Sequence, residues 1–233
     1  MEDIKYELTD WRYEVKFVLD EVELSILENW MFDCAFLNKS YENRIVNSIY
    51  FDDVQRSAVR DNLAGVSNRK KTRIRWYGNV TKASLVVCET KIKNGRLGRK
   101  RRVDLGFIEF DDLENQSDQH IVFIPKFDIV EARTNELALL EPTVIVQYER
   151  EYFNLSMGLR MTVDQSIKTF NVYPEQNVFT HSRKPSNETV VEFKCSVQQK
   201  EILGEILASF PFSARRHSKY MTGSYYLGQS YFV

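Results

Sequence analysis

The stretch "KKTRIRWYG" (70–78) and the next one along the chain, "VVCETKIKNGRLGRKRR" (86–102), read as two β-strands that each carry a charged row. Successive side chains of a strand point to opposite faces of a sheet. Arg73 and Arg75 therefore share one face of the first strand, while Ile74 lies on the other. The second strand repeats the pattern, so the fold has to account for charged rows that are backed by apolar rows.

The same period-two alternation recurs along the chain and predicts about eight strands. They are 12–19, 44–52, 71–78, 85–93, 99–105, 143–153, 159–167 and 189–196, most of them joined by turns of hairpin length. Helical patterns predict four helices, at 20–36, 54–63, 128–140 and 196–210. This pattern is typical of an α+β protein, here an antiparallel β tunnel or barrel of about eight strands with flanking helices.

The charged rows have two interpretations. An ordinary sheet with one face in water explains any single strand. However, arginine and lysine dominate the rows, and the pattern repeats on six separate strands. If the sheet closes, the apolar rows pack outward under the helices and the charged rows converge inside, where like charges need a compensating anion. Such an interior would bind a polyanion, and arginine forks suit phosphate oxygens.

Composition limits the class of protein. The 233 residues are 43% hydrophobic, which is enough for one large core, and we treat residues 1–233 as a single domain. The formal net charge of −1 conceals an asymmetry: residues 69–102 hold 13 Lys and Arg against one acid. Three widely spaced cysteines and the absence of a signal-like or membrane-length apolar segment favour a cytoplasmic protein.

An ordered set of strings carries a resemblance to a known family. The strings are "NSIYFDD" (47–53), "GVSNRKKTRIRWYG" (65–78), "ETKIKNGRLGRKRRV" (89–103), "YEREYF" (148–153), "LRMTVD" (159–164), "VVEFK" (190–194) and "SKYMTG" (218–223). In this order they resemble the VTC domain, the catalytic domain of the vacuolar transporter chaperone polyphosphate polymerases, within the triphosphate tunnel metalloenzymes. The resemblance extends from about Tyr13 to Gly223.

The resemblance implies a tunnel of antiparallel strands with a basic interior that binds a triphosphate. It also implies an enzyme that transfers the γ-phosphate of ATP to a growing polyphosphate chain, helped by Mn²⁺ or Mg²⁺. ATP and polyphosphate or triphosphate are thus the expected partners. No nucleic acid is expected, because the basic segment comes with no recognition helix or RNA-binding string.

The resemblance also implies roles for individual residues. Expected catalytic residues are Arg73, Arg75, Lys91, Arg150, Arg160 and Lys219. Expected phosphate- or substrate-binding residues are Lys16, Arg69, Lys100, Arg102, Lys194, Arg216 and Ser218. Glu192 is the expected metal ligand, although it could instead pair with Lys194 or a neighbouring arginine. Asp164 is expected to orient Arg160 rather than to bind metal.

Three departures and two alternatives accompany the resemblance. The first strand reads Arg12-x-Glu14-x-Lys16 where broader tunnel hydrolases open with Glu-x-Glu-x-Lys, which makes a two-metal hydrolase less expected. Asn62 and Arg216 stand where an arginine and a lysine are expected. The alternatives to a polymerase are a metal-dependent tripolyphosphate or nucleoside triphosphate hydrolase, with Glu14 as the candidate base, and a non-catalytic polyphosphate-binding module.

Overall fold

The computed structural model describes residues 11–78, 83–114, 121–172 and 187–227. Its strands are β1 (Arg12–Leu19), β2 (Asn38–Asp52), β3 (Asn68–Tyr77), β4 (Ala83–Asn94), β5 (Leu97–Glu114), β6 (Ile121–Pro125), β7 (Glu141–Asn154), β8 (Arg160–Asn171) and β9 (Thr189–Ser196). Its α-helices are α1 (Glu21–Asp33), α2 (Ser57–Leu63), α3 (Phe127–Arg133), α4 (Lys200–Ala208) and α5 (Lys219–Tyr226). Two short 3₁₀ helices span Ser156–Gly158 and Val197–Gln199. None of the described helices is long and apolar enough to cross a membrane.

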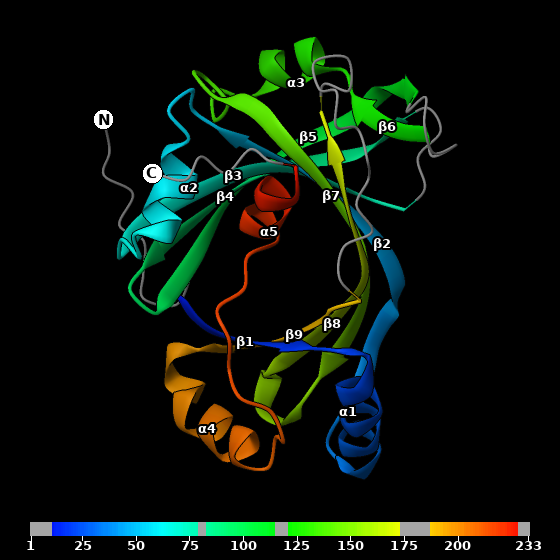
Figure 1. Cartoon of the computed structure of the whole chain (residues 1–233), viewed down its shortest axis with the longest axis vertical. Coiled ribbons are helices and arrows are strands. Elements are labelled where there is room, and N and C mark those ends of the chain that lie inside the picture. The colour runs from blue at the N-terminus through cyan, green and yellow to red at the C-terminus, as the bar shows by residue number, and fades with distance from the viewer. Residues whose placement is uncertain (1–10, 79–82, 115–120, 173–186, 228–233) are drawn as a thin grey trace.

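The strands form one antiparallel sheet that meets itself. Their order is β1-β9-β8-β7-β2-β3-β4-β5-β6, and β1 also pairs with β5. The β1–β5 pairing that closes the sheet covers only two residue pairs, Arg12 with Gly98 and Tyr13 with Leu97. Figure 1 shows the resulting ring, with β6 extending beyond it from β5. The sheet therefore has an inner and an outer side, and alternation assigns each side chain to one of them.

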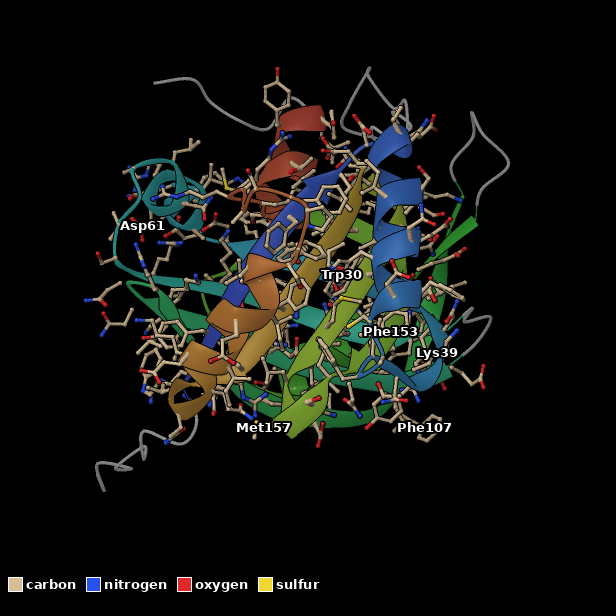
Figure 2. All side chains as sticks on the ribbon, turned by 90° about the horizontal axis from the view of Figure 1, so that it is seen from below. Trp30, Lys39, Asp61, Phe107, Phe153 and Met157 are labelled. Carbon is tan, nitrogen blue, oxygen red and sulfur yellow. The ribbon has the colours of Figure 1, made fainter. Side chains whose placement is uncertain are left out.

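Apolar side chains cover the outer side of β1, β9 and β8. Phe17, Met161 and Phe193 are buried there with Leu27 of α1 and Leu203 of α4. Figure 2 looks onto this side and shows Trp30 between α1 and α4, where its ring meets Phe193 and Phe210 edge-on. The capping box of Asp20 and Glu23 starts α1 at the end of β1. The two helices thus bury the apolar backs of these strands.

A second outer cluster lies under α3. Ile49, Ile74, Trp76 and Cys88 are buried there with Val130 of α3. These residues come from β2, β3 and β4. On β3 and β4 they alternate with the charged rows, and on β2 Ile49 alternates with Ser48 and Tyr50. The charged rows therefore point into the ring.

A third cluster lies inside the ring, where α5 packs against β7 (Figure 1). Tyr220 of α5 is buried with Val144 and Tyr148. Ser166 of β8 has a φ of +51°, at an irregularity of the β7–β8 pairing, and Ile167 beyond it joins the same cluster. The interior thus changes from charged to apolar along β8, and α5 fills the apolar part.

The predicted fold class is confirmed, and all eight predicted strands are present. The sequence patterns did not predict β6 or α5. The four predicted helices are all shorter in the structure: α1 ends at Asp33, α2 begins at Ser57, α3 ends at Arg133, and α4 spans Lys200–Ala208.

Candidate functional site

The interior rows bring charged side chains from seven strands and one helix to the same side of the ring. They are Glu14 and Lys16 of β1, Lys71, Arg73 and Arg75 of β3, Glu89, Lys91 and Lys93 of β4, Lys100 of β5, Arg150 of β7, Asp164 of β8, Glu192 and Lys194 of β9, and Lys219 of α5. Contacts across the ring establish their direction. Lys91 ion-pairs with Glu14, which lies two strands away, and Arg75 donates to the Tyr148 hydroxyl of β7 at 2.9 Å.

Arg73 and Arg75 are held by one carboxylate. Arg73 donates to Glu89 Oε2 from Nε at 2.9 Å and from Nη2 at 2.6 Å, and to the Tyr50 hydroxyl at 3.1 Å. Arg75 Nη1 lies 3.7 Å from the same oxygen, and this arginine is only 4% exposed. Burial raises the pKa of Glu89, but Arg73, Arg75 and Lys100 lower it more, so the pKa lies well below its ordinary value. Glu89 therefore stays ionised and fixes both guanidinium groups.

Arg150 and Lys219 share a second buried carboxylate, that of Asp164. Arg150 donates to its two oxygens at 2.5 and 2.7 Å, and Lys219 Nζ lies 2.5 Å from Oδ2. The expectation that Asp164 orients Arg160 is wrong. Asp164 stands opposite Arg150 in the β7–β8 register, whereas Arg160 lies four residues away at an exposed strand end. Asp164 does orient an arginine, and it links β7 and β8 to α5.

Glu14 and Glu192 form the third acidic position. Glu192 lies 2.9 Å from Lys194 Nζ and 3.8 Å from Lys16 Nζ, so the pairing with Lys194 considered from the sequence is present. Burial and Glu192 raise the pKa of Glu14, while Lys91, Lys194 and Lys16 lower it further, to below its ordinary value. The two carboxylates are close enough to interact, and both are ionised.

Cations outnumber these acids. Burial, with Lys219 and Lys16 nearby, lowers the pKa of His217 to about 3, and neither ring nitrogen of His217 has a hydrogen-bond partner among the described residues. Burial and four neighbouring cations lower the pKa of Lys71 to about 7. Burial is the larger cause of both shifts, and the neighbouring cations add a positive potential that an anion in the ring would relieve.

The donor chemistry of Glu14 and Glu192 fits a small divalent cation. Mg²⁺ is commonly bound by one or two carboxylates together with substrate phosphate oxygens, so two acids suffice when phosphate is present. No group of three or more His, Cys, Asp or Glu within the described ranges could hold a metal ion alone. A metal here would have to compete with Lys194 and Lys91 for the carboxylates.

Most of the expected site residues meet inside the ring. They are Lys16, Arg73, Arg75, Lys91, Lys100, Arg150, Glu192, Lys194 and Lys219, joined by Ser218 at the start of α5. Others lie at the periphery. Arg160 and Arg216 are exposed, Arg102 pairs with exposed Asp104, and Arg69 donates to the Val66 carbonyl at 2.7 Å.

Sequence reasoning missed Lys71 and the tyrosines that hold the arginines. Lys71 shares the odd-numbered row with Arg73 and Arg75, so the signal was present in the quoted stretch. Tyr50 and Tyr148 orient those arginines from β2 and β7. Their role depends on which strands become neighbours, and the sequence of one strand does not show that.

Comparison with solved structures defines the class of protein as one with the triphosphate tunnel fold. A protein of Pyrococcus horikoshii OT3 matches with a TM-score of 0.52 and 14% identity, covering 90% of this chain and 96% of that one. A protein of Vibrio parahaemolyticus, with a proposed adenylate cyclase activity, matches with a TM-score of 0.51 and 13% identity, covering 90% and 97%. These likenesses concern the fold.

The family is defined by a sequence match. The model of the VTC domain matches residues 11–227, and this chain belongs to that family. A search of curated proteins finds no match. Membership of this family supports a role in handling triphosphates and phosphoryl groups.

Proposed function

We propose that this protein is an ATP-dependent polyphosphate polymerase that transfers the γ-phosphate of ATP to a growing polyphosphate chain inside the ring. The observation that carries the proposal is the set of three interior arginines, Arg73, Arg75 and Arg150, each held in place by an interior carboxylate. Phosphoryl transfer depends chiefly on positioning and charge neutralisation, and fixed guanidinium forks supply both.

In the proposed reaction, a terminal oxygen of the polyphosphate chain attacks the γ-phosphorus of ATP. A new P–O bond forms, the bond from the γ-phosphorus to the bridging oxygen breaks, and ADP leaves. The attacking oxygen is already ionised, so no general base is required. This agrees with the described part of the interior, where His217 is the only histidine and burial and nearby lysines lower its pKa to about 3.

Arg73, Arg75 and Arg150 would contact the transferred group and its neighbours, and Lys16, Lys91 and Lys219 would add point charges. Glu89 and Asp164 position the arginines and do not touch substrate. Glu192, with Glu14, would hold Mn²⁺ or Mg²⁺, which would neutralise charge on phosphate oxygens when bound.

A hydrolase that uses water as acceptor is the second candidate. The observation that favours it is the position of Glu14, an ionised carboxylate beside Glu192 in the interior. However, Lys91 occupies this carboxylate in the structure, and a base in an ion pair is a poor proton acceptor.

The test is to incubate the protein with ATP and Mn²⁺ and to measure polyphosphate on a gel together with ADP and free phosphate. We expect one ADP to be released for each phosphate that is added to the polymer. Glu192→Ala and a chelator should each reduce polymer formation by roughly 100-fold or more, because both remove charge neutralisation at the reacting group. Glu151→Ala is the matched control, because this carboxylate pairs with Lys39 outside the charged interior.

Free phosphate without polymer would instead establish the hydrolase. Binding of polyphosphate with neither product would make the protein a binding module and would overturn the mechanism.

A further inference from the structure

Lys71 has an unusual environment for a lysine of the charged interior. Its Nζ donates to two neutral oxygens, Ser218 Oγ at 2.8 Å and Asn62 Oδ1 at 2.9 Å. In contrast, Lys16, Lys91 and Lys194 each pair with a carboxylate. No carboxylate within the described part of the chain lies at ion-pair distance from Lys71. Its charge, when present, is therefore not compensated.

The groups that surround Lys71 are cationic or neutral. The cations that act on it are Lys16 of β1, Arg69 of β3, and Lys91 and Lys93 of β4, while Asn62 comes from α2, and Ser218 and Tyr220 come from α5. Burial, together with these four cations, lowers the pKa of Lys71 to about 7. The side chain is thus only partly protonated at neutral pH.

The two oxygens that accept hydrogen bonds from Lys71, Asn62 Oδ1 and Ser218 Oγ, are fixed by the fold. Asp52 at the end of β2 accepts from the backbone of Ala58 and Val59 in α2 and from the Tyr220 hydroxyl of α5. Ser218 caps α5 and accepts from the Met221 backbone. Because α2 and α5 are both tied to Asp52, Asn62 and Ser218 hold the amine in one place on the inner side of β3.

We propose that Lys71 is a phosphate-binding residue of the interior and that occupation of the ring by a phosphate chain is coupled to the uptake of one proton by its amine. This inference rests on the proposed function, since it assumes that phosphate chains enter the ring. The anion would supply the negative charge that Lys71 lacks, and the amine would pass from donating to Ser218 and Asn62 to donating to phosphate oxygens as an ammonium group.

The direction of the pH effect follows from linkage. In the free protein the pKa of Lys71 is about 7, and a bound polyanion raises it. Below about pH 7 both states hold the proton, and the titration of Lys71 adds no pH dependence to the affinity. Above about pH 7 only the bound state holds it, so affinity should fall by up to about tenfold per pH unit as the pH rises.

The experiment measures binding of tripolyphosphate by calorimetry between pH 6 and 8.5, in buffers of different ionisation enthalpy that report proton uptake. Lys71→Arg is the decisive variant, because an arginine remains charged throughout this range. We expect the wild-type protein to take up about one proton more than Lys71→Arg at pH 8.5, and almost none in excess at pH 6. The difference between the two proteins cancels the titration of tripolyphosphate itself.

Two further variants separate a direct contact from a structural effect. Lys71→Met removes the amine and should weaken binding at pH 6 by roughly tenfold or more. Lys70→Met removes the neighbouring exposed lysine from the same strand and should leave both affinity and proton uptake unchanged. Thermal unfolding of each variant establishes that it is folded.

Equal proton uptake by the wild-type protein and Lys71→Arg would overturn the coupling, and unchanged affinity of Lys71→Met at pH 6 would overturn the contact. Both results leave the proposed function intact. Failure of the wild-type protein to bind tripolyphosphate at any pH would instead overturn the proposed function, and this inference with it.

Discussion

At the scale of single residues, the interior depends on carboxylates that fix arginines. Asp164 is fully buried and accepts hydrogen bonds from both Arg150 and Lys219. Glu89 accepts from Arg73 in the same way. A buried ion pair contributes little net stability, but removing one partner leaves the other charges uncompensated. These acids therefore fix the positions of the cations rather than add net stability, and they do so only while they are ionised.

This predicts that Asp164→Asn destabilises the fold by about 3 kcal/mol at pH 7, because two buried cations lose their shared counter-ion. Burial raises the pKa of Asp164, but Arg150 and Lys219 lower it to well below its ordinary value. Its contribution is therefore present above the unfolded pKa of about 4 and is lost as the pH falls below that value. Chemical denaturation at pH 7 and at pH 3 should show the difference between wild type and variant shrinking with acid.

Asp104→Asn is the control for this prediction. Asp104 pairs with Arg102 where both side chains are mostly exposed, so its removal should change stability by less than about 0.5 kcal/mol. If Asp164→Asn is as stable as this control at pH 7, the buried network does not fix the arginines.

At the scale of elements, α5 completes the site, because it brings Lys219 and Ser218 to the inner face of the sheet. Its close approach depends on Gly223. A Cβ at this position would lie 3.1 Å from both Val144 Cγ2 and Thr169 Cγ2. The glycine therefore lets the helix dock against β7 and β8.

Gly223→Leu should displace α5, destabilise the protein by about 2 kcal/mol through overpacking, and weaken tripolyphosphate binding because Lys219 moves with the helix. Gly204→Leu is a matched control in α4, where a Cβ meets nothing within 4 Å. There the substitution should stabilise the helix by roughly 0.5–1 kcal/mol, since glycine is a poor helix former. Thermal unfolding checks both, and equal stabilities would contradict the packing role of Gly223.

Strands were predictable from the sequence and α5 was not, for physical reasons. Period-two alternation of rows such as Arg73, Ile74 and Arg75 appears directly in the sequence. In contrast, α5 is short, its interior includes Gly223, and its position is set by contacts with β7 that form only when the ring closes. Helices of this length derive their stability from tertiary packing.

At the scale of the whole molecule, closure of the sheet decides whether the charged rows form a site. The sequence predicted which side chains share a face and that closure would gather them. The ion-pair partners of these side chains were not predictable in the same way. Arg160 shares the predicted face of β8 with Asp164, and alternation along one strand cannot show that the true partner lies on another strand. Cross-strand register assigned Asp164 to Arg150. The Arg75–Tyr148 and Lys71–Ser218 contacts join elements that do not pair and are visible only in the folded structure.

The central claim is that phosphate chains bind inside the ring. The most direct measurement is a crystal structure of the protein with tripolyphosphate. We predict that the anion lies inside, within hydrogen-bond distance of Arg73, Arg75 and Arg150. An anion found only at the exposed arginines Arg96, Arg101 and Arg102, with no contact to the interior arginines, would contradict the account.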